Sequence, residues 1–473
     1  MAIHEECGVF GVIAPAGGKV NPAATVYPGL FALQHRGQES CGIVVNAGGA
    51  FTSHKDLGLV AEVFDRRTLA ALGQGDMAVG HVRYGTTGAT SRSNCQPIEV
   101  NHRMGRMAIA HNGNLSNAAA LRERLELSGA IFHATSDTEI IAYLLTRERL
   151  GVPTLDEALS RVFPVMEGAY SLIIMSHNKL ICCRDVRGFR PLSFGVCPDG
   201  SYVAASETAA LAAVGARFVR DVEPGEILVL EQDPDTNGVR ITSRREHCGK
   251  VAKRLCAFEY IYFARPDSVL DGVPVHGARV RAGEILAREH PVAADVVIGV
   301  PDSGLDAALG FARASGIPYE VGLIKNKYIG RTFIAPEQAY RMALVRMKLS
   351  PVAETVAGKR VVLVDDSIVR GTTGECIVRL LREAGAAEIH MRISAPPFLH
   401  PCYYGTDIDS EENLIATHHT PAEIAALMGA DSLGYLPVAA LTEMIGDGDH
   451  CSACFDGDYP TAVPAATRKD AFE

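Results

Sequence analysis

The sequence has no run of apolar residues approaching the roughly 18 that a membrane-spanning helix requires. It has no excess of basic residues either, since 45 lysines and arginines stand against 55 aspartates and glutamates, a net charge of -10. A general nucleic-acid-binding protein would be basic, so this class is excluded, although an acidic protein can still hold a local basic site for an anionic substrate. The first residues also lack the charged and then apolar layout of a signal peptide. We therefore expect a cytoplasmic protein.

Internal repeats and low-complexity tracts are also missing, and the length of 473 residues favours two or three globular domains. The twelve cysteines are scattered along the chain rather than clustered as in a small disulfide framework. In a long chain that lacks a signal peptide, such cysteines are expected to be reduced thiols, metal ligands or catalytic groups.

Short strands separated by turns dominate the sequence up to about residue 240. The expected strands lie within residues 7–15, 42–46, 77–85, 107–113, 170–176, 202–206 and 226–231. One helix is expected over 137–150, where apolar residues recur at helical spacing after Ser136 and Asp137, a typical helix start. Many strands with segregated helices predict an α+β sandwich.

The pattern changes from about residue 280, where apolar, β-branched runs alternate with helical segments. Such continuous runs are typical of strands buried on both faces of a parallel sheet. They occur within residues 294–304, 317–324, 361–364 and 387–394. We therefore expect a second, α/β domain with a parallel sheet and place the boundary near residues 240–260.

The loop between the strand at 361–364 and the following helix carries the most informative motif. It begins with two adjacent carboxylates, Asp365 and Asp366, and continues through residues 367–374. Open α/β sheets bind ligands at the carboxyl ends of their strands, and small residues at a helix start expose backbone N–H groups that suit a phosphate. The acidic pair suits sugar hydroxyls or a divalent metal held with waters. The alternative is a strand–turn–helix whose aspartates and threonines only cap the helix.

The segment 325–349 reverses the charge of the chain locally. One acidic residue, Glu337, stands there against six basic ones: Lys325, Lys327, Arg331, Arg341, Arg346 and Lys348. A mobile lid that closes over a pyrophosphate and excludes water would need such a charge. The alternatives are a solvated basic face or a nucleic-acid patch, because charge runs usually lie on the surface.

Cys7 follows six residues that are too few for a domain and too polar for a signal, and it precedes a strand-like run. It is either a buried strand cysteine or a catalytic nucleophile. Hydrolysis of a glutamine amide needs a thiolate, a base and an oxyanion hole. If residues 1–6 were removed as a propeptide, the α-amino group of Cys7 would be that base. Its ordinary pKa of about 8 lies near the working pH, whereas an internal backbone amide accepts no proton.

Three short stretches after Cys7 supply groups for the remaining roles in amide hydrolysis. Arg83 offers a guanidinium with bidentate geometry for a substrate carboxylate. Asn112 and the Gly113 N–H offer oxyanion donors in a turn where glycine lets the backbone approach a substrate. Asp137 offers a carboxylate for a substrate ammonium group. Taken singly, the Asn112–Gly113 pair also fits an ordinary turn, and Asp137 also fits a helix cap.

The stretch VVLVDDSIVRGTT resembles the phosphoribosyl pyrophosphate (PRPP) signature of the type I phosphoribosyltransferases. The resemblance implies that Asp365 and Asp366 hold the ribose hydroxyls and the metal side of PRPP, while residues 371–374 wrap its 5′-phosphate. The earlier stretch VVIGVPDSG, residues 296–304, would supply a loop on the pyrophosphate side, with Ser303 in reach of the metal. The PRPP-binding residues expected from this resemblance are Asp365, Asp366, Ser367, Arg370, Gly371, Thr372, Thr373, Gly374, Lys325 and Arg331.

The motifs CGVFG, LQHRGQE, VRYGTTG, HNGN and SDTE, in this order, resemble the class II glutamine amidotransferases of the N-terminal nucleophile superfamily. The resemblance implies an αββα sandwich. The residues implied to act on glutamine are Cys7, Arg83, Asn112, Gly113 and Asp137. Together with the PRPP motif, nearly the whole chain is similar to the glutamine PRPP amidotransferase family, and Tyr84 lies where that family couples its two sites.

Cys451 and Cys454 form a CxxC pair that alone fits a zinc half-site, a redox pair or neither. Spacing does not select their partners, because four other cysteines are available: Cys248, Cys256, Cys376 and Cys402. The resemblance to the iron–sulfur branch of the family implies a 4Fe–4S cluster, structural or oxygen-sensing, on Cys256, Cys402, Cys451 and Cys454. Structural zinc on the same four thiols is the alternative.

The resemblance implies an enzyme that hydrolyses glutamine at Cys7 and passes the ammonia internally to PRPP. The products would be 5-phosphoribosylamine, pyrophosphate and glutamate, at the start of purine synthesis. Mg²⁺ at Ser303, Asp365 and Asp366 would neutralise the leaving pyrophosphate, assisted by Lys325 and Arg331. A homotetramer and feedback inhibition by purine nucleotides are also expected.

The expected domains are a propeptide at 1–6, a class II glutamine amidotransferase domain at 7–240, a phosphoribosyltransferase domain at 260–410, and a C-terminal segment at 411–473 with cluster ligands and a tail. Two other functions fit parts of this organisation. One joins the same glutaminase to another acceptor, as in a sugar-phosphate aminotransferase or an asparagine synthetase. The other is a PRPP-binding regulatory protein with an inactive glutaminase half.

Overall fold

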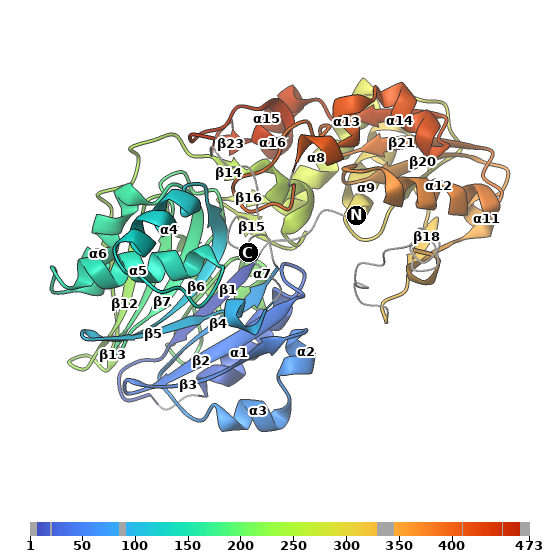
Figure 1. The fold of residues 1–473 in the computed structure, drawn as a ribbon. Coiled ribbons are helices and arrows are strands. Elements are labelled where there is room, and N and C mark those ends of the chain that lie inside the picture. The colour runs from blue at the N-terminus through green and yellow to red at the C-terminus, as the bar shows by residue number, and fades with distance from the viewer. Residues whose placement is uncertain are drawn as a thin grey trace.

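The computed structural model describes residues 7–18, 21–84, 91–328, 345–408, 410–446 and 448–463. The expected propeptide lies outside these residues, as do Arg331 and Arg341 of the expected lid. Figure 1 shows two lobes, one formed by the first half of the chain (blue to green) and the other by the second half (yellow to red). Among the described residues, no helix is both long and apolar enough to cross a membrane.

Two antiparallel sheets, seven- and six-stranded, form the centre of the first lobe. In spatial order the first comprises β11 (Arg217–Asp221), β9 (Ser193–Val196), β10 (Tyr202–Ala205), β1 (Gly8–Ile13), β4 (Met77–Arg83), β2 (Ser40–Ala47) and β3 (Ala50–Leu57). The second comprises β13 (Gly238–Arg244), β12 (Ile227–Asp233), β8 (Lys179–Arg184), β7 (Gly168–Met175), β6 (Gly105–Leu115) and β5 (Ile98–His102).

Strand β1 is apolar throughout, and its position in the sandwich explains this composition. All six residues are buried, because the strand is covered on both faces. Val9 and Ile13 pack in the core between the two sheets, whereas Phe10 and Val12 pack in the core beneath the helices. The alternation of side chains along a strand therefore serves two cores at once.

Helices cover the outer faces of both sheets, which makes four layers. Those of the first sheet are α1 (Pro22–Ala32), α2 (Val60–Val63), α3 (Arg66–Ala71) and α7 (Thr208–Ala213), and those of the second are α4 (Ala118–Leu127), α5 (Asp137–Arg149) and α6 (Leu155–Val162). The Ser136 side chain caps α5 by accepting a hydrogen bond from the Thr138 N–H, as the sequence predicts. The layers confirm the αββα sandwich.

A four-stranded parallel sheet forms the centre of the second lobe and confirms the predicted α/β domain. Its strands, in spatial order, are β17 (Val296–Gly299), β20 (Arg360–Asp365), β21 (Glu388–Ile393) and β22 (Ser432–Tyr435). The helices of this lobe are α8 (Val275–Glu289), α9 (Gly304–Ser315), α11 (Ala353–Val356), α12 (Thr372–Glu383), α13 (Ile415–His418), α14 (Pro421–Met428) and α15 (Leu441–Ile445).

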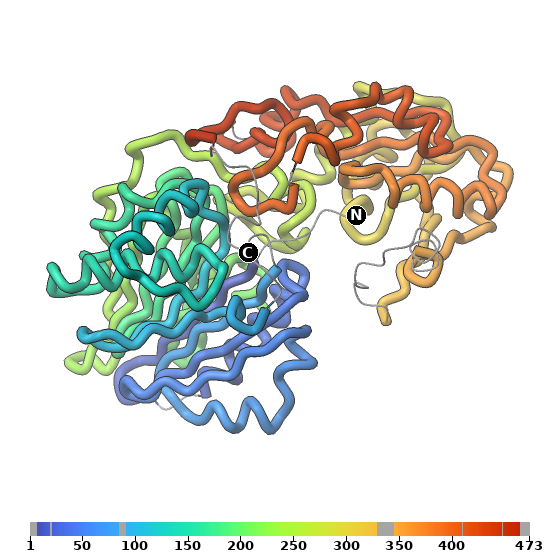
Figure 2. The backbone as a smooth tube through the Cα atoms, in the orientation of Figure 1, coloured from blue at the N-terminus to red at the C-terminus, as the bar shows by residue number. Residues whose placement is uncertain are grey.

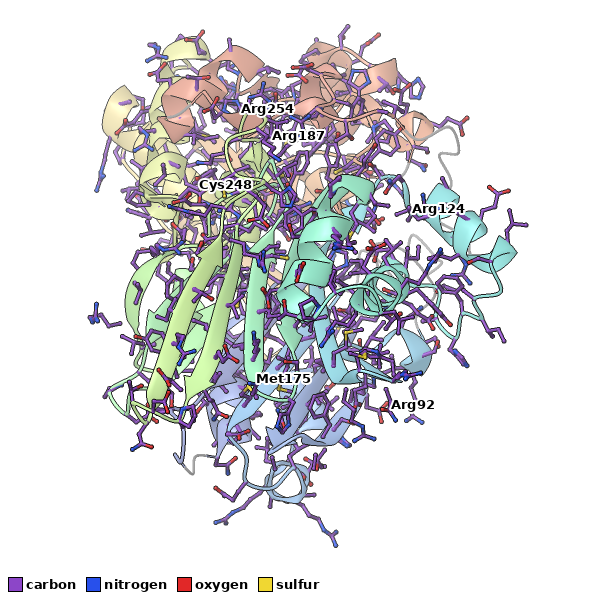
Figure 3. All side chains as sticks on the ribbon, turned by 90° about the vertical axis from the view of Figure 1, so that its left-hand side faces the viewer. Arg92, Arg124, Met175, Arg187, Cys248 and Arg254 are labelled. Carbon is purple, nitrogen blue, oxygen red and sulfur yellow. The ribbon has the colours of Figure 1, made fainter. Side chains whose placement is uncertain are left out.

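A π-helix (Glu259–Phe263) lies in the segment that links the two lobes. The remaining strands form three short pairs: β14 (Leu255–Cys256) with β23 (His450–Cys451), β15 (Val269–Leu270) with β16 (Val273–Pro274), and β18 (Leu323–Lys325) with β19 (Leu349–Pro351). The remaining helical elements are α16 (Ala453–Asp456) and the 3-10 turns Arg92–Asn94, Phe163–Val165, Glu411–Asn413 and Val438–Ala440. In Figure 2 the red C-terminal part of the chain runs back over the second lobe toward the first. Figure 3 shows Arg187 and Arg254 side by side at this junction, where the Arg254 N–H donates to the Arg187 carbonyl at 2.8 Å.

Candidate active sites

Cys7 immediately precedes β1 and is buried, with 8% of its surface exposed. The next residue, Gly8, pairs with Val82 of β4, so the thiol lies beside the end of that strand. There the Cys7 Sγ donates a hydrogen bond of 3.6 Å to the Tyr84 carbonyl oxygen. The strand pairing therefore brings the predicted nucleophile next to the predicted carboxylate-binding residue, Arg83.

Arg83 ends β4 with its side chain almost fully buried, at 3% exposed. Its Nη1 donates to Glu39 Oε1 at 2.9 Å, and the Glu39 N–H donates to the Arg83 carbonyl at 3.0 Å. A buried guanidinium held by a carboxylate keeps one orientation, because its planar fork fixes the directions of the remaining donors. Sequence reasoning missed Glu39, which lies in the LQHRGQE motif but carries no local sign of its partner.

Asn112 and Gly113 lie within the long strand β6, which agrees with the strand expected within 107–113 and not with the turn also suggested for this pair. Asn112 is 0% exposed, and neither of its side-chain amide atoms has a hydrogen-bond partner among the described residues. Buried polar groups normally have hydrogen-bond partners, so this amide is a candidate for binding a ligand. Gly113 has φ +134°, and a Cβ there would lie 2.2 Å from the Ala169 carbonyl oxygen. Only glycine fits, because any side chain would collide with the backbone of the neighbouring strand β7.

Asp137 begins α5 and packs against the same strand. Its Oδ2 accepts from the Leu115 N–H at 2.9 Å, and its Oδ1 lies 3.3 Å from His111 Nδ1. Burial alone would raise the pKa of Asp137, but the His111 charge and these hydrogen bonds outweigh it and hold the pKa below its ordinary value. The carboxylate is therefore ionised, as binding of an ammonium group requires.

Two histidines that the sequence did not single out join these residues. His81, two residues before Arg83, donates from Nε2 to the His111 carbonyl at 2.9 Å and so links β4 to β6. His111 is the residue before Asn112 and contacts Asp137. The structure thus links the predicted glutamine-binding groups through His81 and His111. The only sequence signal was the position of His111 inside the HNGN motif.

Asp365 and Asp366 stand at the carboxyl end of β20, where the sequence predicts a ligand site, and both are buried. The Asp366 N–H donates to Asp365 Oδ1 at 2.9 Å. The two carboxylate oxygens of Asp366 accept hydrogen bonds from the hydroxyls of Ser303 and Ser367. Burial raises the pKa of both aspartates, and for Asp365 the charge of Asp366 raises it further. A cation or a set of hydroxyl donors would stabilise the ionised pair.

Arg370 and the predicted phosphate loop lead directly into α12, which begins at Thr372 and Thr373. Gly371 has φ +77°, and a Cβ there would lie 2.9 Å from Ile415 Cδ1. A Cβ on Gly374 would lie 2.8 Å from Met428 Sδ. The loop and the first turn of α12 therefore pack closely against Ile415 and Met428. The start of this 12-residue helix presents backbone N–H groups that suit a phosphate.

Of the predicted basic lid, the structure describes the two ends. Lys325 ends β18, which pairs with β19 so that Lys325 lies opposite Leu349. Lys325 forms an ion pair with Asp302, next to Ser303, and therefore reaches the predicted pyrophosphate loop. Arg346 forms an ion pair with Glu383 of α12 at 2.7 Å. Arg331 lies outside the described residues, so its role stays a prediction.

The four predicted cluster ligands come from separate parts of the chain. Cys256 of β14 lies opposite Cys451 of β23 in the parallel pair. Cys402 Sγ accepts from the Tyr404 N–H at 3.4 Å. Burial raises the pKa of Cys454 well above its ordinary value, and the charges of Cys402, Cys256 and Cys451 raise it further. The four thiols therefore lie close enough for their charges to act on one another.

Among the described residues, no three His, Cys, Asp or Glu side chains are close enough together to hold one metal ion. A tetrahedral zinc site would draw its sulfurs closely together, since each Zn–S bond is about 2.3 Å long. A 4Fe–4S cluster is a larger body whose thiolate ligands stand further apart. Cys256 and Cys451 are buried and Cys402 and Cys454 are partly exposed, and four thiolates are a donor set that a 4Fe–4S cluster takes.

Comparison with known proteins gives matches in both halves. A glutamine amidotransferase domain family matches residues 81–213, and a phosphoribosyl transferase domain family matches residues 281–406. The chain is 48% identical over 468 residues to the amidophosphoribosyltransferase of Bacillus subtilis, covering 98% of this chain and 95% of that one. It is 47% identical over 470 residues to the amidophosphoribosyltransferase of Methanocaldococcus jannaschii, covering 97% and 98%.

Two solved structures superpose on nearly the whole chain. Glutamine PRPP amidotransferase from B. subtilis, complexed with ADP and GMP, matches with 48% identity and a TM-score of 0.88, covering 98% of this chain and 99% of that one. A structure described as the allosteric regulatory enzyme of purine biosynthesis matches with 47% identity and a TM-score of 0.89 over the same shares.

Proposed function

The chain belongs to the amidophosphoribosyltransferase family, and from that premise we propose how its own residues carry the reaction. The enzyme transfers ammonia from glutamine to PRPP and yields 5-phosphoribosylamine, pyrophosphate and glutamate, the first committed step of de novo purine synthesis. The observation that carries the proposal is the presence in one chain of two built sites. The buried amide of Asn112, which has no partner within the described ranges, lies in the sandwich, and a buried carboxylate pair lies at the end of β20.

In the glutamine site, Cys7 attacks the side-chain amide carbon once residues 1–6 have been removed, with its own α-amino group as base. The Asn112 side chain and the Gly113 N–H donate to the oxyanion, a role supported by the lack of a hydrogen-bond partner for the Asn112 amide among the residues that the structure describes. Arg83 binds the α-carboxylate and Asp137 the α-ammonium group of glutamine. The orientation of Arg83 by Glu39 and the lowered pKa of Asp137 support these roles.

In the PRPP site, Asp365 and Asp366 bind the ribose hydroxyls and the metal side of the substrate. The 5′-phosphate lies against the loop and helix start formed by Ser367, Arg370, Gly371, Thr372, Thr373 and Gly374. Lys325 and Arg331 bind the pyrophosphate. Mg²⁺ would be held by Ser303, Asp365 and Asp366, where it supplies positive charge that neutralises the pyrophosphate. The contact of the Ser303 hydroxyl with Asp366 supports this grouping.

Incubation of the full chain with glutamine, PRPP and Mg²⁺ tests the assignment. We expect glutamate and pyrophosphate to appear in equal amounts, and glutamate release to rise when PRPP is added. Release of glutamate that is indifferent to PRPP, with no pyrophosphate, would contradict it and favour a glutaminase joined to another acceptor.

We propose that Cys256, Cys402, Cys451 and Cys454 hold a 4Fe–4S cluster with a structural or oxygen-sensing role. Protein prepared without oxygen should then contain about four iron atoms per chain and absorb visible light. A Cys451→Ser variant should lose most of this iron, because Cys451 is a buried thiol of β23. A Cys182→Ser variant, which changes a buried thiol of the glutaminase half, is the matched control and should retain it. Stoichiometric zinc in place of iron would contradict the proposal.

We also propose that purine nucleotides inhibit the enzyme, since the B. subtilis relative was solved with ADP and GMP. Titration of ADP and GMP into the same assay checks this. A homotetramer, a cytoplasmic location and the domain limits 7–240, 260–410 and 411–473 are likewise proposals. Sedimentation of the full chain measures the first of these directly.

A further inference from the structure

Residues 402–405 of the second lobe lie against β6, the strand that carries the proposed oxyanion donors. Asn114 Nδ2, one residue beyond those donors, donates a hydrogen bond of 3.0 Å to the Tyr403 carbonyl oxygen. Gly405 is buried at φ +116°, and a Cβ there would lie 3.4 Å from the carbonyl carbon of Gly113. The strand that bears the oxyanion donors is therefore joined to a segment that comes from the other lobe.

The segment 402–405 is itself fixed on the first lobe by two further contacts. The Tyr404 ring stacks on Phe189, with ring centroids 4.2 Å apart and an angle of 17° between the planes, and both side chains are buried. Arg190 Nη2 donates to the Tyr404 carbonyl at 2.8 Å. The Arg190 carbonyl in turn accepts from the hydroxyl of Ser171, which lies on β7 beside β6. The segment is therefore a rigid support, because a buried ring stack and a charge-assisted hydrogen bond oppose its displacement.

This support acts at the Gly113 N–H, one of the two proposed oxyanion donors. A donor stabilises an oxyanion only when it lies about 2.7–3.1 Å from that oxygen and points toward it. Glycine restricts its own backbone little, so the neighbouring residues must set the direction of this N–H. Asn114, the next residue, is tied to Tyr403, and the Leu115 N–H donates to Asp137 at 2.9 Å. The chain after Gly113 is thus held both by the other lobe and by the start of α5.

We propose that Asn114 is a positioning residue for glutamine hydrolysis, which holds the oxyanion donors in place through the second lobe. The proposal rests on the assignment of Asn112 and Gly113 made above. The oxyanion exists only in the transition state and the tetrahedral intermediate, whereas Arg83 and Asp137 bind glutamine in the ground state. Loss of the Asn114 hydrogen bond should therefore lower kcat and leave the KM for glutamine unchanged.

The test compares wild type, Asn114→Ala and Asn114→Asp as full chains. The kcat and KM of glutamate release are measured with PRPP and Mg²⁺ present, and kcat is measured again with ammonium chloride as nitrogen source. In Asn114→Ala we expect the glutamine-dependent kcat to fall about tenfold, because the oxyanion donors shift from their best position. Asn114→Asp keeps the shape but turns a carboxylate oxygen toward the Tyr403 carbonyl, so its kcat should fall at least as far. The KM for glutamine and the ammonia-dependent kcat should keep wild-type values in both variants.

Thr208→Ala is the matched control. Thr208 is half-buried at the start of α7, and its hydroxyl oxygen accepts from the Val269 N–H of β15 at 2.9 Å. This hydrogen bond also joins a first-lobe side chain to the backbone beyond the π-helix, but it lies at α7, which covers the other sheet. The control should keep its glutamine-dependent kcat. The same loss in Thr208→Ala, wild-type kinetics in both Asn114 variants, or a raised KM with unchanged kcat would overturn the inference.

Asn112→Ala in the same assay separates the role of Asn114 from the assignment on which it rests. We expect its kcat to fall on the order of 10²–10³-fold, as for loss of an oxyanion donor. A wild-type kcat in Asn112→Ala would overturn the oxyanion assignment itself. A large fall there, together with wild-type kinetics in the Asn114 variants, would overturn only the role of Asn114. Should Asn114→Ala fail to fold, the isosteric Asn114→Asp decides alone.

Discussion

Replacement of Cys7 by alanine is expected to abolish the glutamine-dependent reaction and to spare the reaction with free ammonia. The loss should be on the order of 10⁵-fold or more in kcat, as when a hydrolase loses its covalent nucleophile. The ammonia-dependent reaction should persist, because the proposed PRPP site lies in the other lobe, on a different sheet. The measurement is product formation from PRPP with glutamine or with ammonium chloride as the nitrogen source.

Cys41→Ala is the matched control for this change. Cys41 is a buried thiol of the same sheet, in β2, and burial raises its pKa to about 12, so it is neither exposed nor ionised. The control should retain glutamine-dependent turnover. Glutamate release that survives in Cys7→Ala would remove Cys7 from the mechanism. Mass spectrometry of active wild-type enzyme should show Cys7 as its first residue, since an uncleaved chain has no α-amino base at that position.

The elements that sequence analysis predicted correctly are those whose patterns are local. The apolar run at 361–364 forms the interior of β20, because a strand that is buried on both faces carries apolar residues at successive positions. The start of α5 was recognisable because Ser136 caps its own helix within two residues. The strand–loop–helix arrangement around Asp365 and Asp366 follows for the same reason, since strand, carboxylates and helix start are contiguous in the chain.

Features that depend on distant partners could not be predicted. The strand expected within 107–113 continues to Leu115 by pairing with β7, through a stretch that also fits a turn. Its burial leaves the Asn112 amide without a partner in the described part of the chain, which no local pattern indicates. Arg36, Glu259 and Arg279 carry no local signal at all, because a charged residue in an isolated sequence is expected at the surface. Only the packing of the π-helix between the lobes shows that Arg36 and Glu259 are buried and paired, and that the buried Arg279 binds the Tyr260 carbonyl.

Asp366→Asn should lower kcat/KM for PRPP on the order of 100-fold in the reaction with ammonia, because a buried carboxylate that binds hydroxyls and a cation contributes charge-assisted hydrogen bonds that an amide cannot replace. The shape of the side chain is kept, and its single amide oxygen can still accept from one of the two serine hydroxyls, while the amide NH₂ can donate to the hydroxyl oxygen of the other. Glutamine hydrolysis without PRPP should change little, since the variant leaves the sandwich untouched. Steady-state kinetics with varied PRPP and fixed ammonium chloride measure the effect.

Asp295→Asn provides the control at the opposite, amino end of the same sheet. Asp295 precedes β17 and binds the Arg360 N–H and guanidinium at the start of β20, where both side chains are partly exposed. An exposed ion pair of this kind contributes about 0–1 kcal/mol, so the control should keep its kinetics and lose little stability. Equal losses in both variants would mean that the sheet, rather than the carboxylate at its ligand-binding end, was disturbed. A loss confined to Asp366→Asn places PRPP at the carboxyl end of β20.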